Sequence, residues 1–367
     1  MVMSRNALFL LALLLLSSES ALPQNAESVV QRLANASDEQ IQRLLSRFPA
    51  ADANNDGRLT REEAIEFTEA RMGNPASKSG ASRKGPEPTH ADVAYGMHER
   101  DVLDFWQADG EGPRPLVVFI HGGGFTSGSK EKYHGTADLK RLLDGGVSCA
   151  AINYPFRDDE PIQNILRHAA RAVQFLRSKS ADWNIDKTRL AGWGGSAGAG
   201  TSLWLATRED LADPDNEDPV LRESSRLQAA VLQSTQATYD LTRWDSFLGP
   251  SDPAWWKSPD EAAEFYHFKA RADLEKPEAM PILRECDMLK WITSDDAPIY
   301  INNNQPDAPS KNRGHYLHHP AHAREIQKAC DEAGVTCVWV QAMEGDKPDP
   351  VDFVRTSLKV ADTLPAE

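Results

Sequence analysis

The feature that most constrains the fold of this chain is a serine placed between glycines at the end of a short apolar run. The run 189–195 leads into Ser196, and a helix-like apolar segment begins at Thr201. Gly194 and Gly198 give the pattern G-x-S-x-G, in which a serine occupies a strained turn between a strand and a helix that approach each other closely. The first backbone N–H groups of such a helix favour an anion at the serine. The pattern predicts a nucleophile, Ser196, although by itself it also fits a glycine-rich turn.

A second motif lies upstream and supplies the other half of the same kind of site. The buried-strand run 116–120 is followed by His121 and three glycines. This H-G-G-G pattern provides backbone amides for an oxyanion hole. We expect the oxyanion donors to be the N–H groups of Gly123, Gly124 and Ala197, and we assign His121 no proton transfer.

The two motifs and the rhythm of the remaining chain predict an α/β-hydrolase fold. Strand-like runs at 147–154, 227–233 and 297–301 alternate with a helical pattern at 162–178. This alternation favours a mainly parallel central sheet with helices on both faces and active groups at the carboxyl ends of the strands. The aromatic region 235–289 interrupts the alternation and is interpreted as a cap or lid insertion.

From Tyr95 onward the chain resembles the hormone-sensitive-lipase-like and feruloyl-esterase-like branch of the α/β-hydrolases. The resemblance rests on Tyr95-Gly96, Leu103-Asp104, the H-G-G-G segment, Asn153-Tyr154 and the elbow Gly194-Gly195-Ser196-Ala197-Gly198. The commoner family form of the elbow has aspartate where this chain has Gly195. The resemblance implies a carboxylic ester hydrolase that acts through an acyl-enzyme on Ser196, with small or polysaccharide-linked esters as substrates.

Hydrolases of this fold carry an acid and then a histidine after the serine. Asp307 follows the strand-like run 297–301 and is the predicted acid. The family histidine follows the last strand, here 335–340, but no histidine occurs after His322. We therefore expect the base to be His318 or His319, in the loop after Asp307.

Three interpretations of this missing histidine stay open. A loop histidine replaces it, since a triad is defined by geometry rather than by sequence position. Alternatively, the serine acts slowly without a full triad, or the domain is an exported calcium-binding interaction protein without catalysis. The four histidines of the loop could also simply precede a helix that starts at Pro320 or bind a metal; they are His315, His318, His319 and His322.

The segment 52–63 matches the calcium loop of an EF-hand. Oxygen ligands fall at the required loop positions and Gly57 occupies the turn. The predicted ligands are Asp52, Asn54, Asp56, the Arg58 carbonyl, Thr60 and Glu63. A single loop of this kind suggests a structural calcium site, and catalysis is expected to need no cofactor.

The N-terminal residues predict export. Arg5 precedes an apolar run of about ten residues and a stretch of small residues, as in a signal peptide, and this run is too short to span a bilayer, which takes ~20 residues. We expect a signal peptide at 1–21, an EF-hand segment at 30–72, a linker at 73–91 and a hydrolase domain at 92–364. The mature protein is then secreted or periplasmic, with no transmembrane segment.

Composition bears on partners and on the cysteines. With 55 acidic and 40 basic residues, the chain has a formal net charge of −15, so nucleic acid is not an expected partner. The four cysteines show no metal-type spacing; buried free thiols are favoured, and Cys330–Cys337 is the most plausible bridge if one forms.

Overall fold

The computed structural model describes residues 33, 36–38, 41–42, 58–61, 64, 85–341 and 349–360. The chain divides into two compact units, Met1–Arg83 and Lys84–Glu367. The predicted signal peptide and the predicted calcium ligands Asp52, Asn54, Asp56 and Glu63 lie outside the described residues. In the first unit Leu33, Ile41, Leu59 and Ala64 are buried, and Leu59 N donates a hydrogen bond to Gln42 Oε1 at 3.1 Å.

The second unit is built on an eight-stranded sheet in the order β1-β2-β4-β3-β5-β6-β7-β8. Strands β1 and β2 run antiparallel to their neighbours, and all pairs from β4 to β8 are parallel. The strands are β1 His90–Ala94, β2 Val102–Trp106, β3 Arg114–Ile120, β4 Ser148–Ile152, β5 Ile185–Gly195, β6 Ala229–Gln233, β7 Ile299–Asn303 and β8 Cys337–Gln341. The predicted mainly parallel sheet is confirmed.

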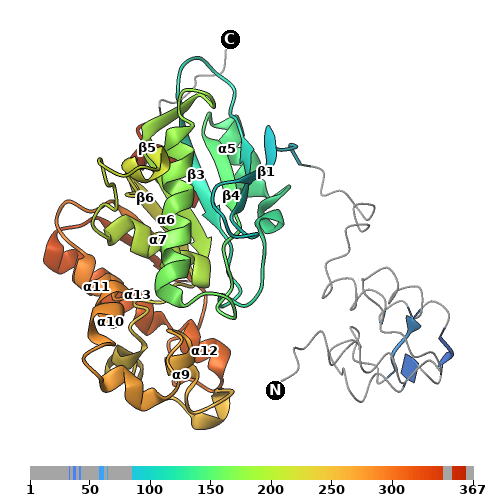
Figure 1. The fold of residues 1–367 in the computed structure, drawn as a ribbon, viewed down its shortest axis with the longest axis vertical. Helices are drawn as coiled ribbons and strands as arrows, with labels where there is room; N and C mark the ends of the chain where they lie inside the picture. Colours follow the sequence, from blue (N-terminus) through green and yellow to red (C-terminus); the bar gives the residue numbers. More distant parts are fainter. Residues whose placement is uncertain are drawn as a thin grey trace. The chain divides into compact units, whose positions relative to one another are not determined.

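Helices cover both faces of this sheet (Figure 1). One face packs against α6 (Ile162–Ser178), α7 (Ala197–Thr207) and α13 (Pro320–Ala333), and the other against α5 (Ala137–Asp144) and α14 (Pro350–Ser357). Alternate residues of the central strands enter the two cores: Val118 and Ile120 lie in the first, and Val117 and Phe119 in the second. Both faces are buried, which explains why these strands read as continuous apolar runs.

The first strand of the sheet lies partly within the segment that the sequence analysis expects to be a linker. Strand β1 begins at His90, inside the predicted linker 73–91, and pairs with β2. Its residues are exposed or half-buried, so it lacks the apolar alternation by which a strand is recognised in sequence.

The insertion between β6 and β7 forms a cap of short helices, drawn in yellow and orange in Figure 1. It contains α8 (Asp245–Leu248), α9 (Glu261–Glu264), α10 (Met280–Glu285) and α11 (Met288–Trp291). A further short helix, α12 (Arg313–Leu317), follows β7 and precedes α13. The cap occupies the region in which the sequence predicted an insertion.

Two findings concern the chain more generally. The four cysteines are free thiols, and Cys149, Cys286 and Cys330 are buried. Among the described residues, no helix combines the length and the apolar character needed to cross a bilayer.

Candidate active site

Ser196 lies at the junction of β5 and α7 in a strained backbone conformation. Its φ is 52° and its ψ is −119°, a region that side-chain-bearing residues rarely occupy. The neighbouring glycines make the turn possible, because a Cβ on Gly194 would lie 2.1 Å from the backbone of Gly198, and one on Gly198 would lie 1.9 Å from Ile120 O. The elbow predicted from the sequence is therefore present in the structure.

The H-G-G-G loop lies against this elbow. Gly123 and Gly124 have positive φ values of 115° and 60°, which glycine adopts without strain. Within 85–341, no described group accepts a hydrogen bond from the N–H of Gly123, Gly124 or Ala197. The structure leaves these three donors available for an oxyanion.

His121, which opens this loop, is fully buried. Its Nδ1 lies 2.8 Å from Gly122 O, and its ring stacks on Tyr154 with centroids 4.2 Å apart. Burial lowers the pKa of His121 to about 4. A neutral ring packed in this way shapes the loop rather than exchanging protons.

The structure brings one of the loop histidines to the serine. Ser196 Oγ and His318 Nε2 lie 2.8 Å apart. His318 is the C-cap residue that directly follows α12, and its backbone carbonyl accepts a hydrogen bond from Asn303 Nδ2 at 3.0 Å. The preceding residue, Leu317, is also held in place, because its carbonyl oxygen accepts a hydrogen bond from Gln236 Nε2 at 2.8 Å.

The other ring nitrogen of His318 has a backbone partner in place of a carboxylate. Nδ1 lies 2.9 Å from the carbonyl oxygen of Gly314, one turn earlier. Because a carbonyl only accepts, Nδ1 carries the proton and Nε2 is left to accept from the Ser196 hydroxyl. Burial lowers the pKa of His318 and the bond to Gly314 opposes this shift, so the ring is neutral at pH 7.

The predicted acid, Asp307, is not in contact with His318. Asp307 forms an ion pair with Arg324 of α13 at 2.5 Å, and its other oxygen lies 3.9 Å from His319 Nε2. Its side chain is about half exposed, so the competing guanidinium holds it at the surface. Among the described residues, no carboxylate forms a hydrogen bond or an ion pair with His318.

The remaining histidines of the loop point to separate partners. His319 Nε2 lies 2.9 Å from Ala308 O, and its Nδ1 accepts from the N–H of Ala321 at the start of α13. His315 Nε2 lies 2.8 Å from Pro306 O, and His322 is buried with Nδ1 3.1 Å from Ala237 N. The described part of the chain contains no cluster of three or more metal-ligating side chains.

The buried carboxylate of Glu261 links the cap to α12 and to Arg157, which lies between β4 and α6. Glu261 of α9 bonds both guanidinium nitrogens of Arg313, at 2.7 and 3.2 Å, and Arg157 at 3.2 Å. Burial opposes ionisation of Glu261, but hydrogen bonds from Lys257 N and Arg313 lower its pKa. Because Arg313 begins α12 and His318 directly follows it, this cluster fixes His318 relative to Ser196.

A small cavity of about 90 Å³ lies at Ser196. Its apolar walls include Phe125, Tyr239 and Phe265, and Arg157, Arg313 and Glu261 lie at its polar side. Such a volume suits a group of a few non-hydrogen atoms next to the nucleophile.

Several of these groups escape sequence analysis. The Gly314 carbonyl gives no signal, because every residue has one, and Glu261, Arg157 and Arg313 are far apart in sequence. Asn303 stands at the end of β7, where active groups gather in such sheets, and this position is the only clue to it.

Comparison with known proteins supports an esterase. A family model described as BD-FAE matches residues 103–309, more than half of the chain. The Mycobacterium tuberculosis protein named "Probable carboxylic ester hydrolase LipM" is 29% identical over 165 residues, which cover 43% of this chain and 37% of that protein. An Arabidopsis thaliana protein named "Probable isoprenylcysteine alpha-carbonyl methylesterase ICMEL1" is 25% identical over 138 residues, 37% of this chain and 29% of that protein. The chain thus spans about a third of the length of these relatives.

Solved structures agree on the fold. A truncated carbohydrate esterase from gut microbiota superposes with a TM-score of 0.58 at 16% identity, covering 77% of this chain and all of that one. An acetyl ester-xyloside bifunctional hydrolase from Caldicellulosiruptor lactoaceticus gives 0.52 at 18% identity, covering 72% of this chain and 90% of that one. At these identities the similarity shows the fold alone, and the predicted α/β-hydrolase fold is confirmed.

Proposed function

Because the chain belongs to the BD-FAE family, we propose that it is a serine hydrolase of carboxylic esters that uses Ser196 as nucleophile and His318 as base. The observation that carries this proposal is the distance of 2.8 Å between Ser196 Oγ and His318 Nε2. A hydroxyl is a poor nucleophile until a base accepts its proton, and this contact supplies the base.

The reaction follows from the positions of these groups. Ser196 Oγ gives its proton to His318 Nε2 and attacks the ester carbonyl carbon. The oxyanion that forms is held by the N–H groups of Gly123, Gly124 and Ala197. His318 then protonates the leaving alcohol, and a water activated by the same ring hydrolyses the acyl-enzyme and releases the acid.

The Gly314 carbonyl replaces the carboxylate of a triad in orienting the ring. It fixes the tautomer, since Nδ1–H must point to it, but it carries only a partial charge. The imidazolium that forms during the reaction therefore gains less stabilisation than beside a carboxylate. We therefore expect slower ester turnover than in an enzyme with a complete triad.

The acyl group is proposed to be short. The cavity at Ser196 measures about 90 Å³ and has aromatic side chains in its walls, which suits an acetyl group. Two of the similar structures are a carbohydrate esterase and an acetyl ester-xyloside bifunctional hydrolase, which supports acetylated carbohydrates as substrates.

The test of the base compares two adjacent histidines. His318→Ala should lower kcat/KM for 4-nitrophenyl acetate by ~10²–10⁴, the usual contribution of a general base, whereas His319→Ala should retain most activity because its ring nitrogens bind backbone groups. Ser196→Ala is the inactive reference. Equal activity of the two histidine variants would refute the assignment, and a wild-type protein without turnover of any ester would favour a non-catalytic calcium-binding interaction protein.

We further propose that the protein is exported to the periplasm or the medium and holds a structural calcium ion in its first unit. The support is the sequence: an apolar leader at 1–21 and an EF-hand loop at 52–63. Export would also place the protein where calcium is abundant enough for a weak site.

Calcium should stabilise the first unit and leave ester turnover nearly unchanged, because the ligands belong to a unit separate from the catalytic one. Calorimetric unfolding with calcium and with a chelator measures this. Glu63→Gln removes the proposed bidentate ligand and should abolish the calcium-dependent shift. A shift of equal size in wild type and Glu63→Gln would contradict the site.

A further inference from the structure

A second and larger cavity lies in the cap, next to the cavity at Ser196. Its volume is about 630 Å³. Leu241, Trp244, Trp256 and Ala262 line both cavities, so the two adjoin. A substrate whose acyl group occupies the small cavity would extend its alcohol portion into the large one.

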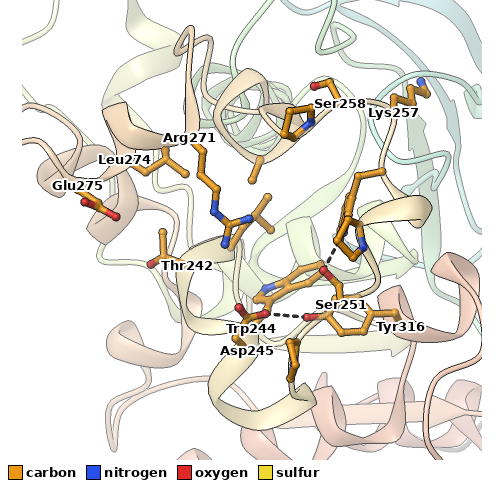
Figure 2. Close-up of a pocket in the computed structure, with 16 residues that line it drawn as sticks. Thr242, Trp244, Asp245, Ser251, Lys257, Ser258, Arg271, Leu274, Glu275 and Tyr316 are labelled. Carbon is orange, nitrogen blue, oxygen red and sulfur yellow. Dashed lines mark hydrogen bonds between the residues drawn. The ribbon is translucent and has the colours of Figure 1, made fainter.

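The aromatic walls of the large cavity are held in place by hydrogen bonds. Trp244 Nε1 donates to Thr238 O at 2.9 Å, and Trp256 Nε1 donates to Ser251 Oγ at 2.7 Å. Tyr316 Oη donates to Asp245 Oδ1 at 3.3 Å, and Figure 2 shows both of the latter contacts at the base of the cavity. Fixed aromatic faces with hydroxyls and a carboxylate beside them suit a ring that carries hydroxyl groups.

Arg271 is an exposed residue that lines this cavity. Its side chain points inward, toward Trp244 (Figure 2). Its backbone N–H bonds Asp260, but within the described part of the chain its guanidinium forms no hydrogen bond or ion pair. A guanidinium has five donors in a planar fork that matches a carboxylate, and here none of them is used.

Among the described residues, none of the other charged side chains that line the cavity forms an ion pair with the Arg271 guanidinium. Lys257 and Glu275 line its edge, but their charged ends point away from its centre (Figure 2). Asp245 accepts the Tyr316 hydroxyl and lies beyond 4.0 Å from the Arg271 guanidinium, since no ion pair joins them. In the adjoining small cavity, Glu261 is shared between Arg157 and Arg313. The two cavities together hold one more inward cation than anion, in a chain whose net charge is −15.

We propose that the large cavity is a subsite for a carboxylate-bearing alcohol portion of the substrate, such as an O-acetylated uronic acid residue, and that Arg271 binds its carboxylate. The sugar ring stacks on Trp244 and Trp256, and its hydroxyls bond Asp245 and Ser251. This subsite rests on the proposed function for its place in the reaction, because it names the alcohol released from the ester.

The kinetic experiment uses two substrates that differ only at C6. O-acetylated methyl galacturonoside carries a carboxylate there, and the O-acetylated methyl galactoside carries a hydroxymethyl group. The wild-type kcat/KM should be about tenfold higher for the uronate, as a charge-assisted hydrogen-bond pair provides. Arg271→Gln should bring this ratio to about one, and Arg271→Lys should retain part of it. Lys257→Gln, which removes a cation whose end points away, should leave the ratio unchanged.

A binding experiment separates failure of this subsite from failure of catalysis. The tryptophan fluorescence of Ser196→Ala, to which Trp244 and Trp256 contribute, reports binding without turnover. Galacturonate should bind about tenfold more tightly than galactose, and adding Arg271→Gln should remove the difference. If Ser196→Ala shows this preference while the wild type hydrolyses no ester, the proposed function fails and the subsite stands. Equal affinities for both sugars, or a preference that survives Arg271→Gln, would overturn the subsite.

Discussion

At the scale of single residues, the site is defined by a contact between two side chains 122 positions apart. The hydroxyl of Ser196 and the ring of His318 meet because the elbow exposes the first and α12 presents the second. The Gly314 carbonyl completes the arrangement and sets the proton on Nδ1. Asp307, which the family pattern assigns to this task, lies at the surface with Arg324.

This placement makes a prediction about Asp307. Asp307→Asn should keep kcat/KM for 4-nitrophenyl acetate within about threefold of wild type, because the side chain touches neither His318 nor Ser196. Loss of a triad carboxylate would instead reduce kcat by about 10⁴. Steady-state kinetics distinguish the two outcomes, and Arg324→Gln, which breaks the same ion pair from the other side, is the matched control.

At the scale of elements, the elbow depends on glycine at some positions and tolerates a side chain at another. A Cβ on Gly194 would lie 2.1 Å from the Gly198 backbone, so β5 and α7 could not keep their present approach. A Cβ on Gly195 would meet only Gln233 Oε1, at 3.8 Å, which is ordinary contact. This explains how relatives accommodate aspartate at that position.

Replacing each of these two neighbouring glycines by alanine should therefore change the stability of the protein in different ways. Gly195→Ala should change the free energy of unfolding by no more than about 1 kcal/mol, with a gain expected from the stiffer unfolded chain. Gly194→Ala should destabilise by several times that amount, because backbone must move to admit the methyl group. Denaturant unfolding measures both, and similar losses in the two variants would contradict the packing described for the elbow.

The cap and α12 are connected by a cluster of charged side chains. Glu261 of the cap forms ion pairs with Arg157, which follows β4, and with Arg313, the first residue of α12. Removing one partner of a buried charge cluster leaves the others unpaired, which is costly. The same elements line the two cavities, so in the proposed enzyme the cap would both position His318 and contact the substrate.

At the scale of the whole catalytic unit, two fully buried histidines make stability depend on pH. Burial lowers the pKa of His121 to about 4 and that of His322 to about 3, whereas a histidine in the unfolded chain titrates near ~6.5. Below that pH the unfolded state binds protons that the folded state does not, so stability is lost as pH falls toward the folded pKa values.

The free energy of unfolding should accordingly decrease by about 3 kcal/mol for each of these histidines between pH ~6.5 and ~4. Denaturant unfolding at a series of pH values gives the slope of the free energy of unfolding against pH. His322→Gln should show a pH slope that is smaller than that of the wild type by up to one proton. An unchanged slope in His322→Gln would show that His322 is not the source.

The sequence by itself predicted the fold, a candidate nucleophile and a candidate oxyanion loop, because these depend on local patterns: apolar runs, glycines at fixed offsets and a serine between them. It also narrowed the base to two histidines by elimination. Only the tertiary structure placed His318, rather than His319, next to Ser196, kept Asp307 away from His318 and brought Arg271 into the cavity beside Trp244. Those outcomes depend on how distant loops pack and on which competing partner a charged side chain meets. The role of the Gly314 carbonyl cannot be recognised in a sequence, because every residue has a backbone carbonyl.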